Sequence, residues 1–88
     1  MDYRVILLDS AERELRKLDR QVVYSRLRKA IAALGGDPRP PGRLKLSTQS
    51  SYRIRVGDYR VIYEIEDAIR VVSVTKVGPR GGFYDRLP

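Results

Sequence analysis

Four arginines and one tyrosine in the second half of the chain provide the functional groups most suited to chemistry. They are Arg53, Arg55, Arg60, Arg80 and Tyr84. Guanidinium is a planar fork of donors that binds phosphate oxygens in pairs, and it does not titrate near neutral pH. A cluster of such groups can bind a phosphodiester and neutralise the charge that develops on its oxygens during in-line displacement. These residue types therefore indicate an anion site.

Tyr84 is the only obvious general-base candidate in this set, because an arginine cannot easily remove a proton. Positive charge nearby favours the phenolate form of a tyrosine. If the attacking group is the 2′-OH of RNA, the reaction needs no metal and no activated water, and DNA is excluded as a substrate. On composition alone, plain nucleic-acid binding is nevertheless favoured over catalysis.

The composition excludes several other kinds of site. Histidine and cysteine are both absent, which rules out serine and cysteine hydrolase triads and leaves no imidazole or thiolate for zinc or iron. Gly78, Gly81 and Gly82 resemble a phosphate-binding loop only loosely, because no Lys-Ser/Thr pair follows them. Carboxylates fall mainly on predicted helix exteriors and turns, so a two-metal nuclease centre is not expected. We therefore expect no cofactor and no metal.

The chain is strongly basic, with 18 Lys and Arg against 11 Asp and Glu and a net charge of +7 over 88 residues. Such a balance favours polyanionic partners, namely RNA, DNA or an acidic protein. The length predicts one domain over residues 1–88. No apolar run approaches the ~18 residues of a membrane span and no signal-peptide pattern is present, so we expect a cytoplasmic protein without a membrane partner.

The arginines must be positioned by a predicted β-hairpin, in which two alternating runs at 52–56 and 59–65 flank Gly57-Asp58. A two-residue loop fixes four opposed pairs: Val56 with Tyr59, Arg55 with Arg60, Ile54 with Val61, and Tyr52 with Tyr63. One face is then apolar, and the other carries Arg53, Arg55 and Arg60. Like charges directly opposed across a ladder are destabilising. This arrangement is best explained by a bound anion.

The first half of the chain predicts one strand and two helices. Residues 3–8 form a short apolar strand, which we expect to be buried on both faces. Asp9 or Ser10 can cap a helix that runs to about residue 18 with Leu15 and Leu18 inward, and Asp19 can cap a second helix. Gly35-Gly36 ends the second helix. Its apolar stripe consists of Val23, Leu27, Ala30, Ile31 and Leu34.

The second half predicts three more strands after a proline-rich connector at 37–42. Alternation begins at residues 44–46, continues through the hairpin, and returns at 69–77 after a turn at Glu66-Asp67. If that turn is also two residues long, Val72 and Val74 lie on the face of Val61, and Ser73 lies opposite Arg60. The predicted class is α+β with element order β-α-α-β-β-β. Two helices pack on one face of a mostly antiparallel sheet, and the other face is comparatively open and carries the arginines.

Three segments resemble the RelE/ParE toxin superfamily of bacterial and archaeal toxin–antitoxin systems. They are the stretch 52–63 (YRIRVGDYRVIY), the stretch 74–80 (VTKVGPR) and Phe83-Tyr84. The first closely resembles the RelE-like signature, and the helical half agrees in layout. The resemblance implies a ribosome-dependent endoribonuclease that cuts mRNA in the A site, with an antitoxin as its inhibitor.

Carried over by position, the resemblance assigns roles to the arginine cluster. Arg53 and Arg55 form the basic pair at the scissile region, Arg60 holds the phosphate, and Arg80 stabilises the transition state or the leaving oxygen. Tyr84 orients or activates the 2′-OH. RelE-like proteins often have lysine where this chain has Arg53 and Arg55, and many have a basic residue where it has Pro79. Both departures shift the expected mechanism from acid–base catalysis toward electrostatics.

The resemblance also implies partners and leaves alternatives open. An acidic, RelB-like antitoxin that folds as it wraps the basic domain is the expected partner, in a hetero-oligomer. Five further basic residues are candidates for RNA or ribosome contact, although an ordinary solvated face explains the helical ones equally well: Arg26, Arg28, Lys29, Lys45 and Lys76. Two other functions remain possible, a ParE-like inhibitor of DNA gyrase and a non-enzymatic basic module that binds RNA or protein.

Overall fold

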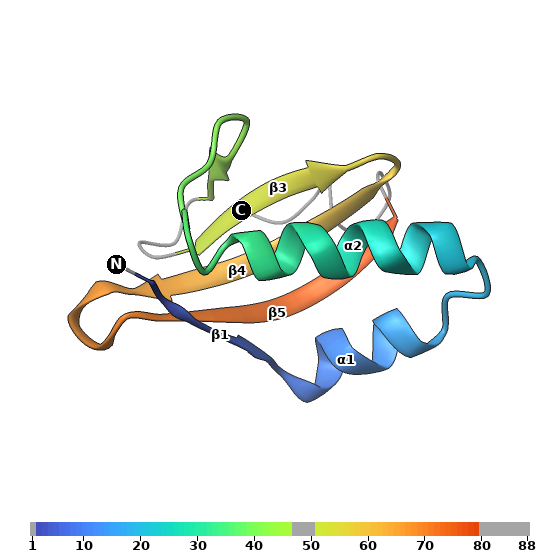
Figure 1. Ribbon diagram of the computed structural model, residues 1–88, viewed down its shortest axis with the longest axis horizontal. Helices are drawn as coiled ribbons and strands as arrows, with labels where there is room; N and C mark the ends of the chain where they lie inside the picture. Colours follow the sequence, from blue (N-terminus) through green and yellow to red (C-terminus); the bar gives the residue numbers. More distant parts are fainter. Residues whose placement is uncertain (1, 47–50, 80–88) are drawn as a thin grey trace.

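The computed structural model describes residues 2–46 and 51–79. Its elements follow the predicted order with one more strand than predicted after the helices (Figure 1). They are β1 (Arg4–Leu7), α1 (Asp9–Arg16), α2 (Gln21–Ala33), β2 (Leu44–Lys45), β3 (Ser51–Val56), β4 (Tyr59–Glu66), a short 3-10 turn (Asp67–Ile69) and β5 (Val71–Pro79). Among the described residues, no helix is long and apolar enough to cross a membrane.

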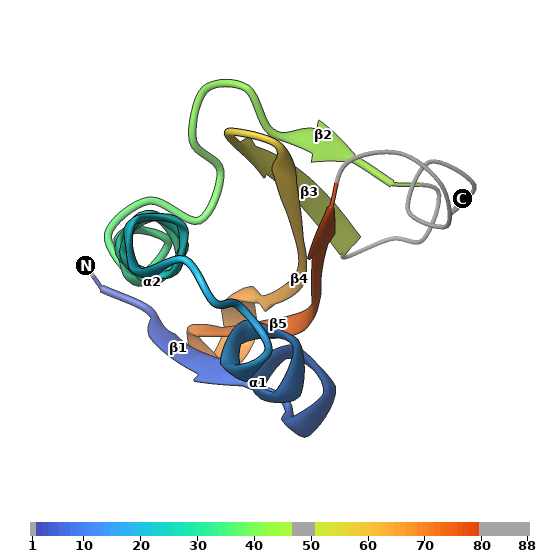
Figure 2. The ribbon, with the colours of Figure 1, turned by 90° about the vertical axis from the view of Figure 1, so that its right-hand side faces the viewer.

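The strands form one sheet in the order β1-β5-β4-β3-β2. β1 runs parallel to β5, and the other neighbours are antiparallel. The two helices lie on one side of this curled sheet (Figure 2), where α1 packs against β5 and α2 against β3. The predicted α+β class and the mostly antiparallel sheet covered by two helices are confirmed.

The β3–β4 hairpin has the predicted register at all four pairs, including Arg55 directly opposite Arg60 and Tyr52 opposite Tyr63. The turn at Gly57-Asp58 has a positive φ, of 60°, only at its first central residue. This pattern matches a type II′ turn, in which glycine is favoured at that position. The turn chemistry and the alternation together fixed this part of the fold.

The predicted pairing of β4 with β5 is wrong. The two strands are joined by the 3-10 turn and by Arg70, which has a positive φ of 54°. This longer connection places Arg60 opposite Gly78 and Glu64 opposite Ser73, with an irregularity at Ile62/Tyr63. Val72 and Val74 still lie in the core beside Val61, as predicted. No glycine or proline marks this turn, so its length could not be inferred from local signals.

β1 is not buried on both faces as predicted. It lies at the sheet edge and pairs only with β5, so Val5 and Leu7 pack against the core while the alternate side chains face outward. Ile6 remains 37% exposed and Leu8, just after the strand, 42% exposed. A continuous apolar run suggested a central strand, but only its neighbours decide whether a strand is central.

The helices begin one or two residues away from the predicted caps. Leu8 is the N-cap of α1 and Arg20 that of α2, and neither has a side-chain capping bond. The Ser10 hydroxyl instead donates to the carbonyl of Thr75 at 2.7 Å, which ties α1 to β5.

The core lies between the helices and the sheet, and the predicted apolar stripes supply much of it. From the helical half come Ala11, Leu15, Leu27, Ile31 and Leu34. α2 ends at Ala33, just before the predicted glycine pair. A Cβ on Gly35 would lie 3.1 Å from the carbonyl oxygen of Tyr3. A side chain there would crowd the backbone of the N-terminal segment, so glycine is favoured.

Candidate functional site

Four basic side chains share the sheet face opposite the helices, and we call them the arginine face: Arg53, Arg55, Arg60 and Lys76. Two neighbouring rows of the sheet contain them. Arg53, Ile62 and Lys76 form one row across β3, β4 and β5, and Arg55, Arg60 and Gly78 form the next. The structure thus brings Lys76, predicted as a separate RNA contact, onto the same face as three of the four predicted catalytic arginines.

The arginine face is less open than predicted. Arg55 is exposed and Arg53 is half-buried, but Arg60 is only 7% exposed and the neighbouring Ile62 only 6%. Charged side chains are seldom this buried in proteins. A guanidinium held at low exposure interacts more strongly with a nearby anion than one in bulk water. Arg60 is therefore the member of the face best suited to stabilise developing charge.

The remaining predicted basic contacts lie elsewhere. Arg26, Arg28 and Lys29 are exposed on α2 and Lys45 is exposed on β2. Arg28 lies 3.8 Å from a Glu12 carboxylate oxygen and 5.9 Å from the centre of the Tyr24 ring. Arg28 thus has a local structural role. Lys29 and Lys45 are not gathered with the arginine face.

Arg80 and Tyr84, the other two predicted catalytic residues, lie outside the described residues. β5 is described as far as Pro79, which pairs with Tyr59 next to Arg60. Arg80 is the next residue of the sequence. The roles assigned to Arg80 and Tyr84 remain predictions.

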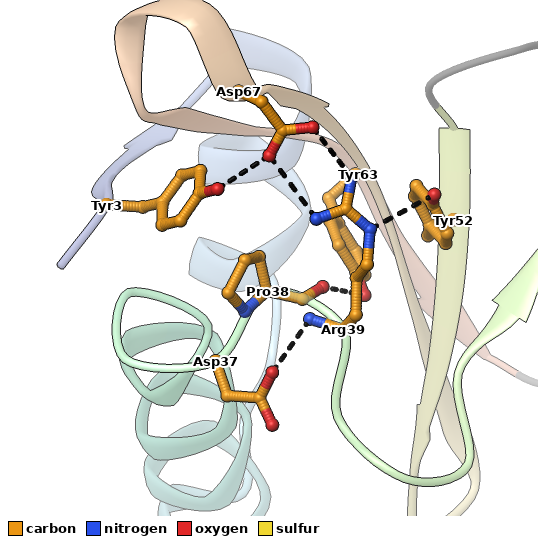
Figure 3. A network of polar contacts seen from close by, with 7 residues as sticks. All are labelled: Tyr3, Asp37, Pro38, Arg39, Tyr52, Tyr63 and Asp67. Atoms are coloured by element: carbon orange, nitrogen blue, oxygen red, sulfur yellow. Dashed lines mark hydrogen bonds and ion pairs between the residues drawn. The ribbon is translucent and has the colours of Figure 1, made fainter. Parts of the chain in front are cut away.

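A polar network that sequence reasoning missed anchors the proline-rich connector to the sheet (Figure 3). Arg39 donates to both carboxylate oxygens of Asp67, at 3.3 and 2.8 Å, and its Nε donates to the Tyr52 hydroxyl at 3.3 Å. Its guanidinium also lies 5.5 Å from the centre of the Tyr52 ring. The Tyr3 hydroxyl donates to Asp67 at 2.6 Å. These contacts join segments that are distant in sequence, so no local sequence pattern predicts them.

Tyr63 connects this network to the core. Its ring stacks on that of Tyr52 with centroids 5.8 Å apart, and its hydroxyl donates to the carbonyl of Pro38 at 2.8 Å. Burial raises the pKa of Tyr63 to about 12. The phenol therefore stays protonated at neutral pH, and it serves as a structural donor rather than as a base.

Acid should weaken the Asp67 anchor. The hydrogen bonds from Arg39 and Tyr3 hold the pKa of Asp67 below its ordinary value of 3.8. A carboxyl with a lowered folded-state pKa stabilises the fold at pH above the unfolded value, and this contribution is lost as the pH falls through the folded pKa. We expect Asp67→Asn to unfold at a lower temperature than wild type at pH 7, with the difference shrinking as the pH falls below 3.8 and the Asp67 carboxyl becomes protonated.

Thermal unfolding followed by circular dichroism at several pH values measures this convergence. Glu66→Gln is the matched control, because Glu66 is the neighbouring residue, is exposed, and forms no ion pair or side-chain hydrogen bond within residues 2–46 and 51–79. An Asp67→Asn protein that stays equally destabilised at every pH would contradict the assignment.

Comparison with known proteins identifies the class. A family model described as the ParE toxin of the type II toxin-antitoxin system, parDE, matches residues 5–82. The toxin RelG of Mycobacterium tuberculosis is 29% identical over 87 residues, which are 98% of this chain and 100% of that protein. The chain therefore belongs to the type II toxin family of the RelE/ParE superfamily.

Solved structures agree with the RelE side of that superfamily. In the archaeal RelE–RelB complex from Pyrococcus horikoshii OT3, a chain is 32% identical to this one with a TM-score of 0.82, over 92% of this chain and 98% of that chain. The isolated RelE toxin of E. coli is 29% identical with a TM-score of 0.76, over 91% of this chain and 86% of that one. The predicted RelE-like fold is confirmed, and the chain is a toxin of a type II toxin–antitoxin system.

Proposed function

We propose that this toxin is a ribosome-dependent endoribonuclease that cleaves mRNA in the A site. The observation that carries the proposal is the arginine face, above all the directly opposed pair of Arg55 and Arg60. Two like charges directly opposed across a ladder repel each other, and a phosphodiester bound between them is attracted by both. The likeness to RelE toxins over nearly the whole chain supports the same conclusion.

The proposed reaction is an in-line displacement at phosphorus. The 2′-oxygen of the RNA attacks the adjacent phosphodiester and gives up its proton, the bond to the 5′-oxygen of the next nucleotide breaks, and that oxygen is protonated. The products are a 2′,3′-cyclic phosphate and a 5′-hydroxyl. Arg53, Arg55 and Arg60 bind the phosphate and stabilise its charge. Arg80 stabilises the leaving oxygen, and Tyr84 orients or activates the 2′-OH.

We also propose that an acidic antitoxin of RelB type is encoded next to this toxin, and that the toxin acts in the cytoplasm. Two structures similar to this chain are complexes of a RelE toxin with its antitoxin. A net charge of +7 favours an acidic partner. A neighbouring reading frame that encodes a short acidic protein, and that suppresses toxicity when co-expressed, is the expected finding.

Gyrase inhibition is the second candidate, because the matching family model is described as a ParE toxin. ParE-type proteins share the fold but act on DNA gyrase. The two functions are separated by two assays on the same preparation: mapping of mRNA ends after incubation with programmed ribosomes, and supercoiling by purified gyrase. We expect A-site cuts and unimpaired supercoiling. Inhibited supercoiling without cuts would replace the proposal by the ParE function, and neither effect would favour a non-enzymatic binding module.

A further inference from the structure

A polar cavity of about 180 Å³ lies between α2 and the tip of the β3–β4 hairpin. Arg20, Val23 and Arg26 line it from the helix side, and residues 56–59 line it from the hairpin side. Cavities that bury small-molecule ligands usually measure ~300–1,000 Å³. This one is smaller, so it suits a single charged group with its waters rather than a whole nucleotide.

The two arginines of this cavity have no carboxylate partner in the described part of the chain. The ion pairs within the described residues use Arg16, Lys17, Arg28 and Arg39, and neither Arg20 nor Arg26 takes part in any of them. Asp58 is the one carboxylate in the lining, so two positive charges face one negative charge. The lining therefore has a net charge of +1, and it favours an anion.

The guanidinium of Arg26 lies next to the hairpin turn at Gly57. A Cβ added to this glycine would lie 3.6 to 3.8 Å from three atoms of that guanidinium. The guanidinium is thus packed close to the turn, where Gly57 has a φ of 60°. Packing of this kind reduces the freedom that a long side chain must lose when it binds a ligand.

We propose that this cavity binds a backbone phosphate of RNA other than the scissile one. The inference rests on the proposed function and extends it around the hairpin tip. Val56 and Tyr59 of the tip line the cavity, and the adjacent pair Arg55 and Arg60 belongs to the opposite side of the same two strands. A strand of RNA that crosses the tip can present one phosphate to each side, because it carries a charge at every nucleotide. An acidic peptide has no such regular spacing.

The test uses the salt dependence of binding to ribosomes programmed with an mRNA that carries a 2′-deoxy nucleotide at the A site, which cannot be cleaved. Each phosphate contact contributes roughly 0.7 to 0.9 to the slope of log K against log salt concentration. Because the cavity holds one phosphate, the Arg20→Ala/Arg26→Ala double variant should bind with a slope smaller by roughly 0.7 to 0.9. The Arg20→Lys/Arg26→Lys variant retains both charges and should keep the wild-type slope.

The matched control is Arg4→Ala/Arg13→Ala, which removes the same charge from exposed positions. Arg4 pairs with Val71, at the end of β5 away from the hairpin tip. An equal loss of slope in this control, or no loss in the cavity variant, would overturn the proposal. So would a cavity variant that loses affinity only for the antitoxin, since that result would assign the cavity to a protein partner.

Binding is measured without cleavage, so the two proposals can fail separately. A wild-type protein that binds ribosomes with the cavity-dependent slope but never cuts mRNA would overturn the nuclease proposal and support the phosphate cavity. If the wild-type protein cuts mRNA but the cavity variant shows no change in slope, the nuclease proposal is supported and the phosphate cavity is overturned. Thermal unfolding of each variant, with a midpoint near that of wild type, confirms that the slope reports on binding.

Discussion

Arg60→Ala is expected to slow A-site cleavage of mRNA by about 10²- to 10³-fold, which is the usual effect of removing one donor that stabilises charge in a transition state. Arg60 is suited to this role because it lies directly opposite Arg55 and has only 7% of its surface exposed. The measurement is the single-turnover rate of cleavage at saturating concentrations of programmed ribosomes. The mRNA ends are mapped at the same time to confirm the position of the cut.

Two further variants separate charge from geometry at this position. Arg60→Lys keeps a positive charge but loses the planar fork, so we expect its rate to fall between those of Arg60→Ala and wild type. Arg4→Ala removes an exposed arginine on β1 and should cleave like wild type. An Arg60→Ala protein that folds with the wild-type unfolding midpoint and cleaves at the wild-type rate would exclude Arg60 from the site.

Tyr63→Ala is expected to be the most damaging substitution in the network, with a loss of about 3–5 kcal/mol in the free energy of unfolding. Tyr63 has 0% of its surface exposed and stacks against Tyr52. Small domains have a total stability of about 5–15 kcal/mol, so this loss is a large share of it. Urea unfolding followed by circular dichroism gives the free energy.

Tyr63→Phe isolates the hydroxyl from the ring. This variant leaves the buried carbonyl of Pro38 without its donor, and it should cost about 1–3 kcal/mol. Tyr24→Phe is the control, because Tyr24 is half-buried and its hydroxyl makes no hydrogen bond within the described part of the chain. Equal effects of the two Tyr→Phe changes would show that the Pro38 contact does not anchor the connector.

The hairpin shows how much of the fold could be predicted. Gly57-Asp58 supplied the turn and the alternating side chains supplied the faces, so all four opposed pairs follow from local information. The return from β4 to β5 has no such signal. Its length depends on a 3-10 turn and on a left-handed Arg70, and the resulting register moved Gly78 rather than Ser73 to the position opposite Arg60.

The candidate site, like the fold, could be predicted from the sequence only in part. Residue type and alternation placed Arg53, Arg55 and Arg60 on one face, but the burial of Arg60 and the arrival of Lys76 depend on the neighbouring strand. The Arg39–Asp67 anchor joins residues 28 positions apart through side chains alone, and the sequence has no pattern that indicates such a pair. Contacts of this kind become visible only when the chain is folded.

The central proposal is attack by the RNA 2′-oxygen on a ribosome-bound mRNA, and one measurement tests it directly. Ribosomes are programmed with two mRNAs that differ only by a 2′-deoxy substitution at the scissile nucleotide, and the cleaved ends are mapped and characterised. We expect cuts in the all-RNA message alone, with a 2′,3′-cyclic phosphate on one fragment and a 5′-hydroxyl on the other. Cleavage of the deoxy-substituted message at the same position, or a 5′-phosphate product, would contradict the proposed mechanism.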